Sequence, residues 1–329
     1  LDDGWWTNIR LDPELRVDQG YRGDDGRPRF AKILLNRARF RVDLNNGNKN
    51  EAEFGLTIHP LYDYSHAIFL DAFAQEDERG FGLAYSYGFG GSLDERRYSA
   101  GVRAGFTAEH LIDNVIRQAA LLGESEGNLV SVNAGLSFDT RAFQANPTFG
   151  LGVGVGIEHS DTVFGTDFRF DLYSASLAAV YSVVRGTQLG VQLIGGYLHG
   201  SRIPAQRRLD AGGEGAVRGI RTSEFLGRYL FVVRSEVRQM LLEDLDVPVL
   251  WMFWLRKLQG VLFLDAGDAQ NDFEELFDGH WRWGTGFGVR AFADVFGVTN
   301  ITFRFDVGFR IDETDDLGPE FYFGAGQSF

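Results

Sequence analysis

The chain has 329 residues, 44% of them hydrophobic, and contains 42 glycines, 29 phenylalanines, 11 tyrosines and 6 tryptophans but no cysteine. Its net charge of −14 disfavours nucleic acid as a partner, because the phosphate backbone would be repelled. The lack of cysteine excludes disulfides, thiolate catalysis and zinc–thiolate sites. No run of about 18 uncharged apolar residues occurs, which excludes a membrane-spanning helix but leaves membrane barrels possible, since these hide their hydrophobicity in alternation. The first residues, LDDGWW, do not resemble a signal peptide, so we expect a mature or truncated form.

Alternation of apolar and polar residues, interrupted by polar turn clusters, predicts strands along the whole chain. The predicted strands lie near 5–17, 29–43, 51–60, 65–75, 80–90, 95–107, 128–140, 148–160, 167–183, 187–200, 226–240, 258–268, 281–292, 300–310 and 320–329. Residues 109–122 alternate poorly and could form a short helix, a loop or a further strand. Because bacterial barrels have even strand counts, we predict sixteen strands in a single domain over 1–329.

The two faces of these strands decide between a soluble sandwich and a membrane barrel. In FGLAYSYGFG (81–90) aromatic residues alternate with glycine, alanine and serine, and in ITFRFDVGFR (301–310) they alternate with arginine, aspartate and glycine. A soluble sandwich would bury an aliphatic layer and expose polar residues. An aromatic face opposite a small or charged face instead fits lipid outside and a polar lumen inside. We therefore predict an all-β fold, a single transmembrane antiparallel β-barrel.

The segments between strands carry weaker signals. The acidic clusters at 23–26, 75–79 and 312–318 are interpreted as solvated loops, or as cation-bridged contacts with anionic lipopolysaccharide. VPVLWMFWLRK at 247–257 breaks the alternation, and we interpret it as an interfacial aromatic anchor at a turn or as a buried turn of helix.

The glycine-rich stretch AGGEGAVRGI at 211–220 resembles a phosphate-binding loop only superficially. Its glycines at 213, 215 and 219 do not fit G-x-G-x-x-G, and no amphipathic helix follows. No Walker A or G-x-S-x-G motif occurs, and the six histidines lack metal-ligand spacing. We therefore expect no cofactor, no metal site and no enzymatic activity. An outer-membrane lipase or protease remains a less favoured alternative, with His159 beside Asp161 as its nearest candidate pair.

The last third of the chain resembles a known family through four motifs in order: AGGEGAVRGIRTSEFLGRYLFVVRSEVR, LQGVLFLDAGDAQ, WGTGFGVR and a terminal FYFGAGQSF. The sequence is similar to the BamA/TamA superfamily of outer-membrane assembly and two-partner secretion proteins, the bacterial surface antigen barrels. TRAFQANPTFGLGVG at 140–154 resembles the D-x-R…P-x-x-G segment of that family. The resemblance covers about 128–329, and the first third matches only as alternating strands.

The resemblance implies a loop, at about 201–223, that folds back into the lumen and carries VRGI. Within Val217, Arg218 and Gly219, the arginine would pair with Asp265, while Glu236 is a second candidate partner. Asp265 shares the inward parity of Phe263 and Gly267 on its strand. The glycines that would let this loop approach the wall closely are Gly212, Gly213 and Gly215.

The motif-bearing strands at 226–329 end in aromatic residues of one parity, Phe321, Phe323 and Phe329. These resemble the signal by which assembly machinery recognises barrel strands, which would make the chain a client of such machinery as well.

The resemblance implies an integral protein of the outer membrane of a Gram-negative (diderm) bacterium. Its expected activity is the non-catalytic insertion or translocation of polypeptides through a lateral seam between the first and last strands, or service as the barrel subunit of an assembly complex. The expected partners are outer-membrane lipid and lipopolysaccharide, unfolded or β-rich polypeptide clients, and periplasmic or lipoprotein subunits. A passive pore or an orphan structural barrel is the alternative. Family members that insert or secrete proteins carry POTRA domains before the barrel, and none fits here, so we expect either that such domains precede Leu1 in a longer protein or that this is an orphan barrel.

Overall fold

The computed structural model describes the chain in twelve segments. These are residues 6–11, 34–45, 51–59, 66–75, 78–93, 96–112, 126–141, 149–249, 253–279, 281–295, 299–311 and 318–325.

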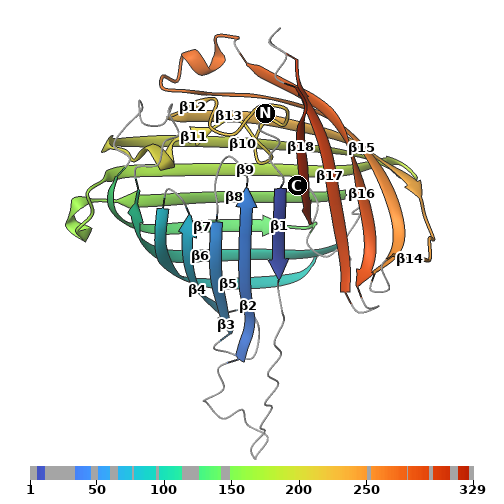
Figure 1. Ribbon diagram of the computed structural model, residues 1–329, viewed down its shortest axis with the longest axis horizontal. Helices are drawn as coiled ribbons and strands as arrows, with labels where there is room; N and C mark the ends of the chain where they lie inside the picture. The colour runs from blue at the N-terminus through green and yellow to red at the C-terminus, as the bar shows by residue number, and fades with distance from the viewer. Residues whose placement is uncertain are drawn as a thin grey trace, which may run out of the picture.

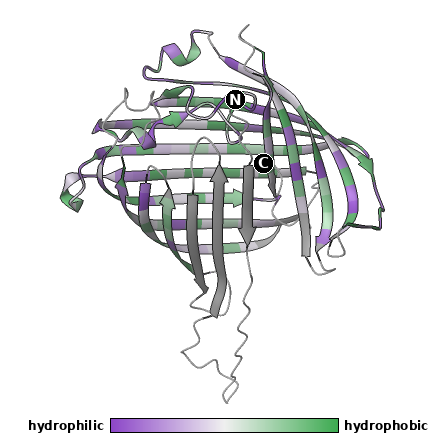
Figure 2. Cartoon of the chain, in the orientation of Figure 1, coloured by the Kyte–Doolittle hydropathy of each residue, from purple (hydrophilic) through white to green (hydrophobic). Residues whose placement is uncertain are grey.

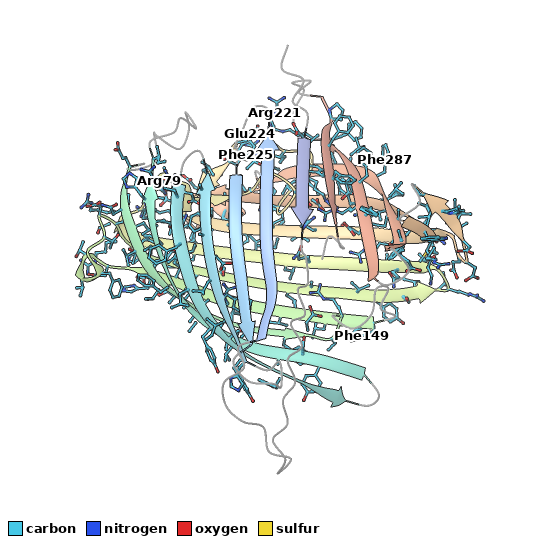
Figure 3. The ribbon with its side chains drawn as sticks, turned by 60° about the horizontal axis from the view of Figure 1, so that its bottom comes forward. Arg79, Phe149, Arg221, Glu224, Phe225 and Phe287 are labelled. Atoms are coloured by element: carbon cyan, nitrogen blue, oxygen red, sulfur yellow. The ribbon has the colours of Figure 1, made fainter. Side chains whose placement is uncertain are left out.

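Fifteen antiparallel strands follow one another in chain order along a single sheet, and each overlaps one of the fifteen predicted ranges. They are β1 (Trp6–Leu11), β2 (Leu34–Asn45), β3 (Glu51–His59), β4 (His66–Gln75), β5 (Glu78–Leu93), β6 (Arg96–Leu111), β7 (Gly127–Asp139), β8 (Phe149–Ser160), β9 (Arg169–Val184), β10 (Thr187–Arg202), β13 (Tyr229–Leu242), β15 (Phe253–Gln270), β16 (Arg282–Val295), β17 (Thr299–Arg310) and β18 (Glu320–Ala325). Figures 1 and 3 show the sheet curling round until β1 and β18 lie near each other. The prediction of an all-β antiparallel barrel is therefore confirmed.

The predicted count of sixteen full strands is not confirmed within the described residues. A further three-residue strand, β14 (Val247–Val249), pairs with β15 just beyond the point where β13 stops pairing with it. Because β13 and β14 lie along the same edge of β15, β14 continues the position of β13 instead of adding a new one. In the ambiguous segment 109–122, β6 runs through Leu111, and residues 113–122 lie outside the described part of the chain.

The remaining described elements are short. They are three 3-10 turns, η2 (Thr162–Phe164), η3 (Ala205–Arg207) and η4 (Glu275–Phe277), and a two-stranded sheet of β11 (Leu209–Asp210) and β12 (Leu226–Gly227). Among the described residues, no helix is long and apolar enough to cross a membrane.

The strand faces differ as the alternation predicted. On β15, the outward Leu262 keeps 64% of its surface exposed, whereas the inward Asp265 keeps 0%. Phe81 and Phe89 are exposed on β5, as is Phe287 on β16, and Figure 2 shows hydrophobic and hydrophilic residues alternating along the strands. So much exposed apolar surface would be unfavourable in water, and lipid must cover it.

In the aromatic stretch 247–257, the described residues form β14 and the first part of β15, which pair antiparallel, and β15 begins at Phe253 and not near 258 as predicted. The break in alternation matches a register shift between Leu255 and Lys257 in the pairing of β15 with β16. Arg256 binds Asp246 and Asp294 there, with N–O distances of 2.6 and 2.5 Å. The proposed role as an interfacial anchor stays a prediction.

Candidate functional site

The connection between β10 and β13, residues 203–228, is folded against the inner wall of the barrel. The pairing of β11 with β12 closes its base, and Asp210 accepts hydrogen bonds from the N–H groups of Gly212 and Ser223 at 2.8 and 2.6 Å. Within the tip of the loop, residues 211–220, the Gly213 N–H donates to the Ile220 carbonyl at 2.9 Å. The tip is therefore a closed turn with its own hydrogen bonds, which can dock as a unit.

Hydrophobic packing holds the tip of the loop against the inner wall of the barrel. Ala216, Val217 and Ile220 form a buried cluster with Val232 of β13, and Val217 is fully buried. Full burial of a valine or isoleucine side chain contributes roughly 1.5–3 kcal/mol. This packing holds the backbone of Arg218 beside β15.

The Arg218 guanidinium binds two wall carboxylates. Its Nε and Nη2 donate to Asp265 Oδ2 and Oδ1 at 2.7 and 2.9 Å, and its Nη1 donates to Glu236 Oε1 at 2.6 Å. All three side chains are 0% exposed, and the guanidinium lies 3.7 Å from the centre of the Phe263 ring. A two-pronged arginine–carboxylate pair of this geometry is both strong and directional.

This environment keeps Arg218 charged. Burial acts to lower the pKa of Arg218, but the hydrogen bond to Asp265 and the charges of Asp265, Glu236 and Asp306 outweigh burial and raise its pKa above the ordinary value. The loop thus presents a permanent cation to the wall.

The buried network extends to further wall residues that the sequence reasoning did not select. Arg238 Nε donates to Glu236 Oε2 at 2.8 Å, and Arg290 Nη1 donates to Asp306 Oδ1 at 2.6 Å. Arg234 faces Asp265 across the β13–β15 pair. The sequence signal for these residues was their place on the polar face of their own strands: Arg234 and Arg238 share the parity of Glu236 on β13. Arg290 and Asp306 alternate with the exposed Phe287, Val289 and Phe305 on β16 and β17. What alternation could not tell was which of them meet.

Two inward glycines make room for the tip. A Cβ on Gly284 of β16 would overlap the carbonyl oxygen of Arg218, and a Cβ on Gly308 of β17 would lie 2.7 Å from the Gly219 nitrogen. Gly219 itself has a φ of 94°, which disfavours any residue with a side chain. The VRG turn, residues 217–219, therefore packs against β16 and β17 where inward glycines replace larger side chains.

The same loop has a second arginine anchor, on the opposite part of the wall, which the sequence reasoning missed. Arg207 in η3 donates from Nη1 to Glu78 of β5 at 3.1 Å and from Nε to Glu158 of β8 at 3.4 Å, and its Nη2 binds Glu109 of β6. The Glu109 side chain is 1% exposed and that of Arg207 is 17% exposed. Burial acts to lower the pKa of Arg207, but the charges of the three glutamates raise it above the ordinary value. The loop therefore spans the lumen from β5–β8 to β13–β17.

The returning arm of the loop is held near one end of the strands, where Figure 3 labels Arg221, Glu224 and Phe225. Glu224 accepts a hydrogen bond from Arg310 Nη1 at 2.5 Å. The Arg282 and Arg310 guanidiniums lie 4.4 and 5.2 Å from the centre of the Phe225 ring. Cation–π contacts of this kind fix the arm to β16 and β17.

The other predicted loop and strand residues are placed as follows. Gly212 and Gly213 are buried in the tip, whereas Gly215 is exposed. Gly267 faces β13, where a Cβ would meet the Phe231 carbonyl oxygen at 2.6 Å. Phe321 and Phe323 are exposed on the outer face of β18, and Phe329 lies outside the described residues.

The candidate hydrolase pair is not formed as predicted. His159 Nδ1 lies 2.7 Å from Asp171 Oδ1, its register partner on β9. Asp161 instead accepts from the Val163 N–H at 3.1 Å and binds Arg169 at 3.0 Å. Strand pairing, which the local sequence does not reveal, decides which carboxylate meets the histidine. In the D-x-R segment, Arg141 Nη2 donates to Asp139 Oδ2 at 2.8 Å.

Comparison with known proteins supports one family. The sequence profile described as the Omp85 superfamily domain matches residues 36–329. Among solved structures, the chain is similar to BamA from Haemophilus ducreyi lacking POTRA domains 1–3, with a TM-score of 0.59 and 12% identity over 88% of this chain and 64% of that chain. It is also similar to CdiB from Acinetobacter baumannii (TM-score 0.56, 13% identity, 88% of this chain and 52% of that chain) and to CdiB from Escherichia coli (TM-score 0.55, 14% identity, 97% and 61%). The chain thus spans between about half and two thirds of the length of these proteins, and at such identities the likeness shows the fold.

Proposed function

The chain belongs to the Omp85 superfamily, and from this premise we propose that it inserts or translocates polypeptides at the outer membrane of a diderm bacterium. The proposed activity is non-catalytic and uses the barrel itself. BamA and CdiB, to which the fold is similar, are the relatives that motivate it. The proposed clients are unfolded or β-rich polypeptides, and periplasmic or lipoprotein subunits are the proposed partners.

The docked loop is the observation that carries this proposal over a passive pore. A steadily conducting barrel needs a hydrated path, and charges that line water are partly exposed. Here Arg218, Asp265 and Glu236 are completely buried, and Arg207 holds the same loop to the other side of the wall. Such an arrangement supports a barrel that is occluded at rest and that changes state when it acts.

The place where the barrel would open is proposed to be the junction of β1 and β18. Among the described residues, β1 and β18 are the two ends of the strand order, and no ladder joins them. β18 pairs with β17 on one side and β1 with β2 on one side. An unpaired strand edge is a template for an incoming strand.

The test is insertion of an unfolded outer-membrane barrel client into liposomes that contain the purified full chain. We expect the folded client, measured by its heat-resistant gel mobility, to accumulate faster than in empty liposomes or in liposomes with an unrelated barrel of similar size. Equal rates in all three would refute the proposed function. Equal rates together with a large, steady conductance in planar bilayers would identify a passive pore instead.

A further inference from the structure

The inner face of the last strand touches the docked loop at two points. The Tyr322 hydroxyl oxygen accepts a hydrogen bond from the Gly219 N–H at 2.9 Å, and Glu320 Oε1 accepts one from Arg221 Nε at 3.1 Å. Both residues alternate with the outward Phe321 and Phe323. Thus the loop contacts β18 from inside the barrel, while lipid faces its other side.

The loop also holds the strand that β18 pairs with. Glu214 binds Arg304 of β17, and the Gly219 backbone rests on Gly308. β18 pairs with β17 over Phe303–Gly308. The loop therefore pins the β17–β18 pair as a unit, in addition to the cross-strand hydrogen bonds.

The contact with Tyr322 cannot move independently of the arginine anchor. Gly219 directly follows Arg218, whose side chain binds β13 and β15. A Cβ on Gly219 would lie 2.6 Å from the Phe309 backbone, so the turn is already in close contact with β17. The Arg218 N–H also donates to Asp265 Oδ2 at 3.2 Å, so movement of the turn away from the wall breaks the arginine anchor and the hydrogen bond from Gly219 to Tyr322 together.

We propose that Tyr322 is a positioning residue through which the docked loop holds the last strand in place, so that release of the Arg218 anchor and loosening of β18 are one event. The inference deepens the proposed function, on which its consequence for activity rests, because β18 borders the proposed opening. The coupling between the loop and the strand is a property of the barrel and is measurable without a client.

The experiment is hydrogen exchange, followed by mass spectrometry, on the full chain in lipid nanodiscs. Tyr322→Phe removes only the hydroxyl that accepts the Gly219 N–H. Since exchange reports local opening and one hydrogen bond is lost, we expect the amides of 320–325 to exchange about fivefold faster, while those of β9 and β10 stay unchanged. The matched control is Tyr181→Phe on β9, which removes a hydroxyl from an exposed tyrosine and should leave 320–325 unaffected.

Arg218→Lys supplies the remote test, because it keeps the charge but loses the fork that binds β13 and β15. We expect it to accelerate exchange in 320–325 as well as in the loop. Unchanged exchange of 320–325 in Tyr322→Phe, or acceleration confined to the loop in Arg218→Lys, would overturn the proposal.

The client assay separates this inference from the proposed function. If the wild-type chain inserts clients, Tyr322→Phe should insert them faster, since the last strand is less restrained. Faster exchange of β18 without faster insertion would overturn the positioning role. Absence of insertion by the wild type would refute the proposed function, while the exchange result would still decide whether Tyr322 couples the loop to the strand.

Discussion

Removal of the Arg218 anchor should destabilise the barrel less than removal of its main carboxylate partner. Arg218→Ala deletes three side-chain hydrogen bonds to Asp265 and Glu236 and the contact with the Phe263 ring. Asp265→Ala instead leaves the guanidinium buried, with Glu236 as its remaining hydrogen-bonded carboxylate. Both changes leave a buried charge with fewer partners, which is the costly case.

The sign of the difference follows from the charges of the buried cluster. Four arginines (218, 234, 238 and 290) face three carboxylates (236, 265 and 306), all with side chains at most 3% exposed. Arg218→Ala therefore leaves three of each, whereas Asp265→Ala leaves four cations and two anions. We expect a loss of about 3 kcal/mol in the free energy of unfolding for Arg218→Ala and about 5 kcal/mol for Asp265→Ala, the lower and upper ends of the range for a broken buried pair.

The assay is denaturant unfolding in lipid vesicles, supported by the temperature at which the compact gel mobility is lost. The double variant should lose less than the sum of the single losses, because the two groups interact directly. Arg221→Ala is the control, since Arg221 is 55% exposed in its pair with Glu320 and should cost at most about 1 kcal/mol. Wild-type stability of both single variants, or strict additivity of the two, would refute the idea that a buried ion pair holds the loop.

Three further predictions address the rest of the loop. Arg207→Ala should lower the free energy of unfolding by about 3 kcal/mol, because it removes the cation that binds the buried Glu109 carboxylate. Glu109→Gln in that background should recover part of the loss, and no recovery would contradict a charge effect. Gly284→Ala should lower the free energy of unfolding by about 1–3 kcal/mol, because the new Cβ would push the loop tip away from β16. Gly195→Ala, where a Cβ meets nothing within 4 Å, should be tolerated. Equal effects of the two changes in unfolding experiments would argue against close packing of the tip. In planar bilayers, Arg218→Ala should raise the conductance above a low wild-type value, and an unchanged conductance would show that the loop does not occlude the lumen.

The strands and their faces were predictable from the sequence because each depends on local alternation. Every second residue of a strand points the same way, so the lipid-facing aromatics of β5 and the inward charges of β13 follow from residue order alone. The pairing of Arg218 with Asp265 could be anticipated only from the family resemblance together with parity, since nothing local joins positions 47 residues apart. The predicted count of sixteen rested on the poorly alternating segment 109–122 and on the even-number rule for barrels, and neither could anticipate that a short strand, β14, continues the line of β13.

The sequence by itself determined that the chain forms alternating strands with an aromatic outside and a charged inside, and it marked the VRG turn. Only the tertiary structure decided which inward groups meet. Parity gives the face of a residue but neither its height along the barrel nor its position around it, both of which depend on strand register and closure. For this reason Arg207 finds Glu78, Glu109 and Glu158 on three different strands, and Tyr322 reaches the Gly219 N–H from the far end of the chain.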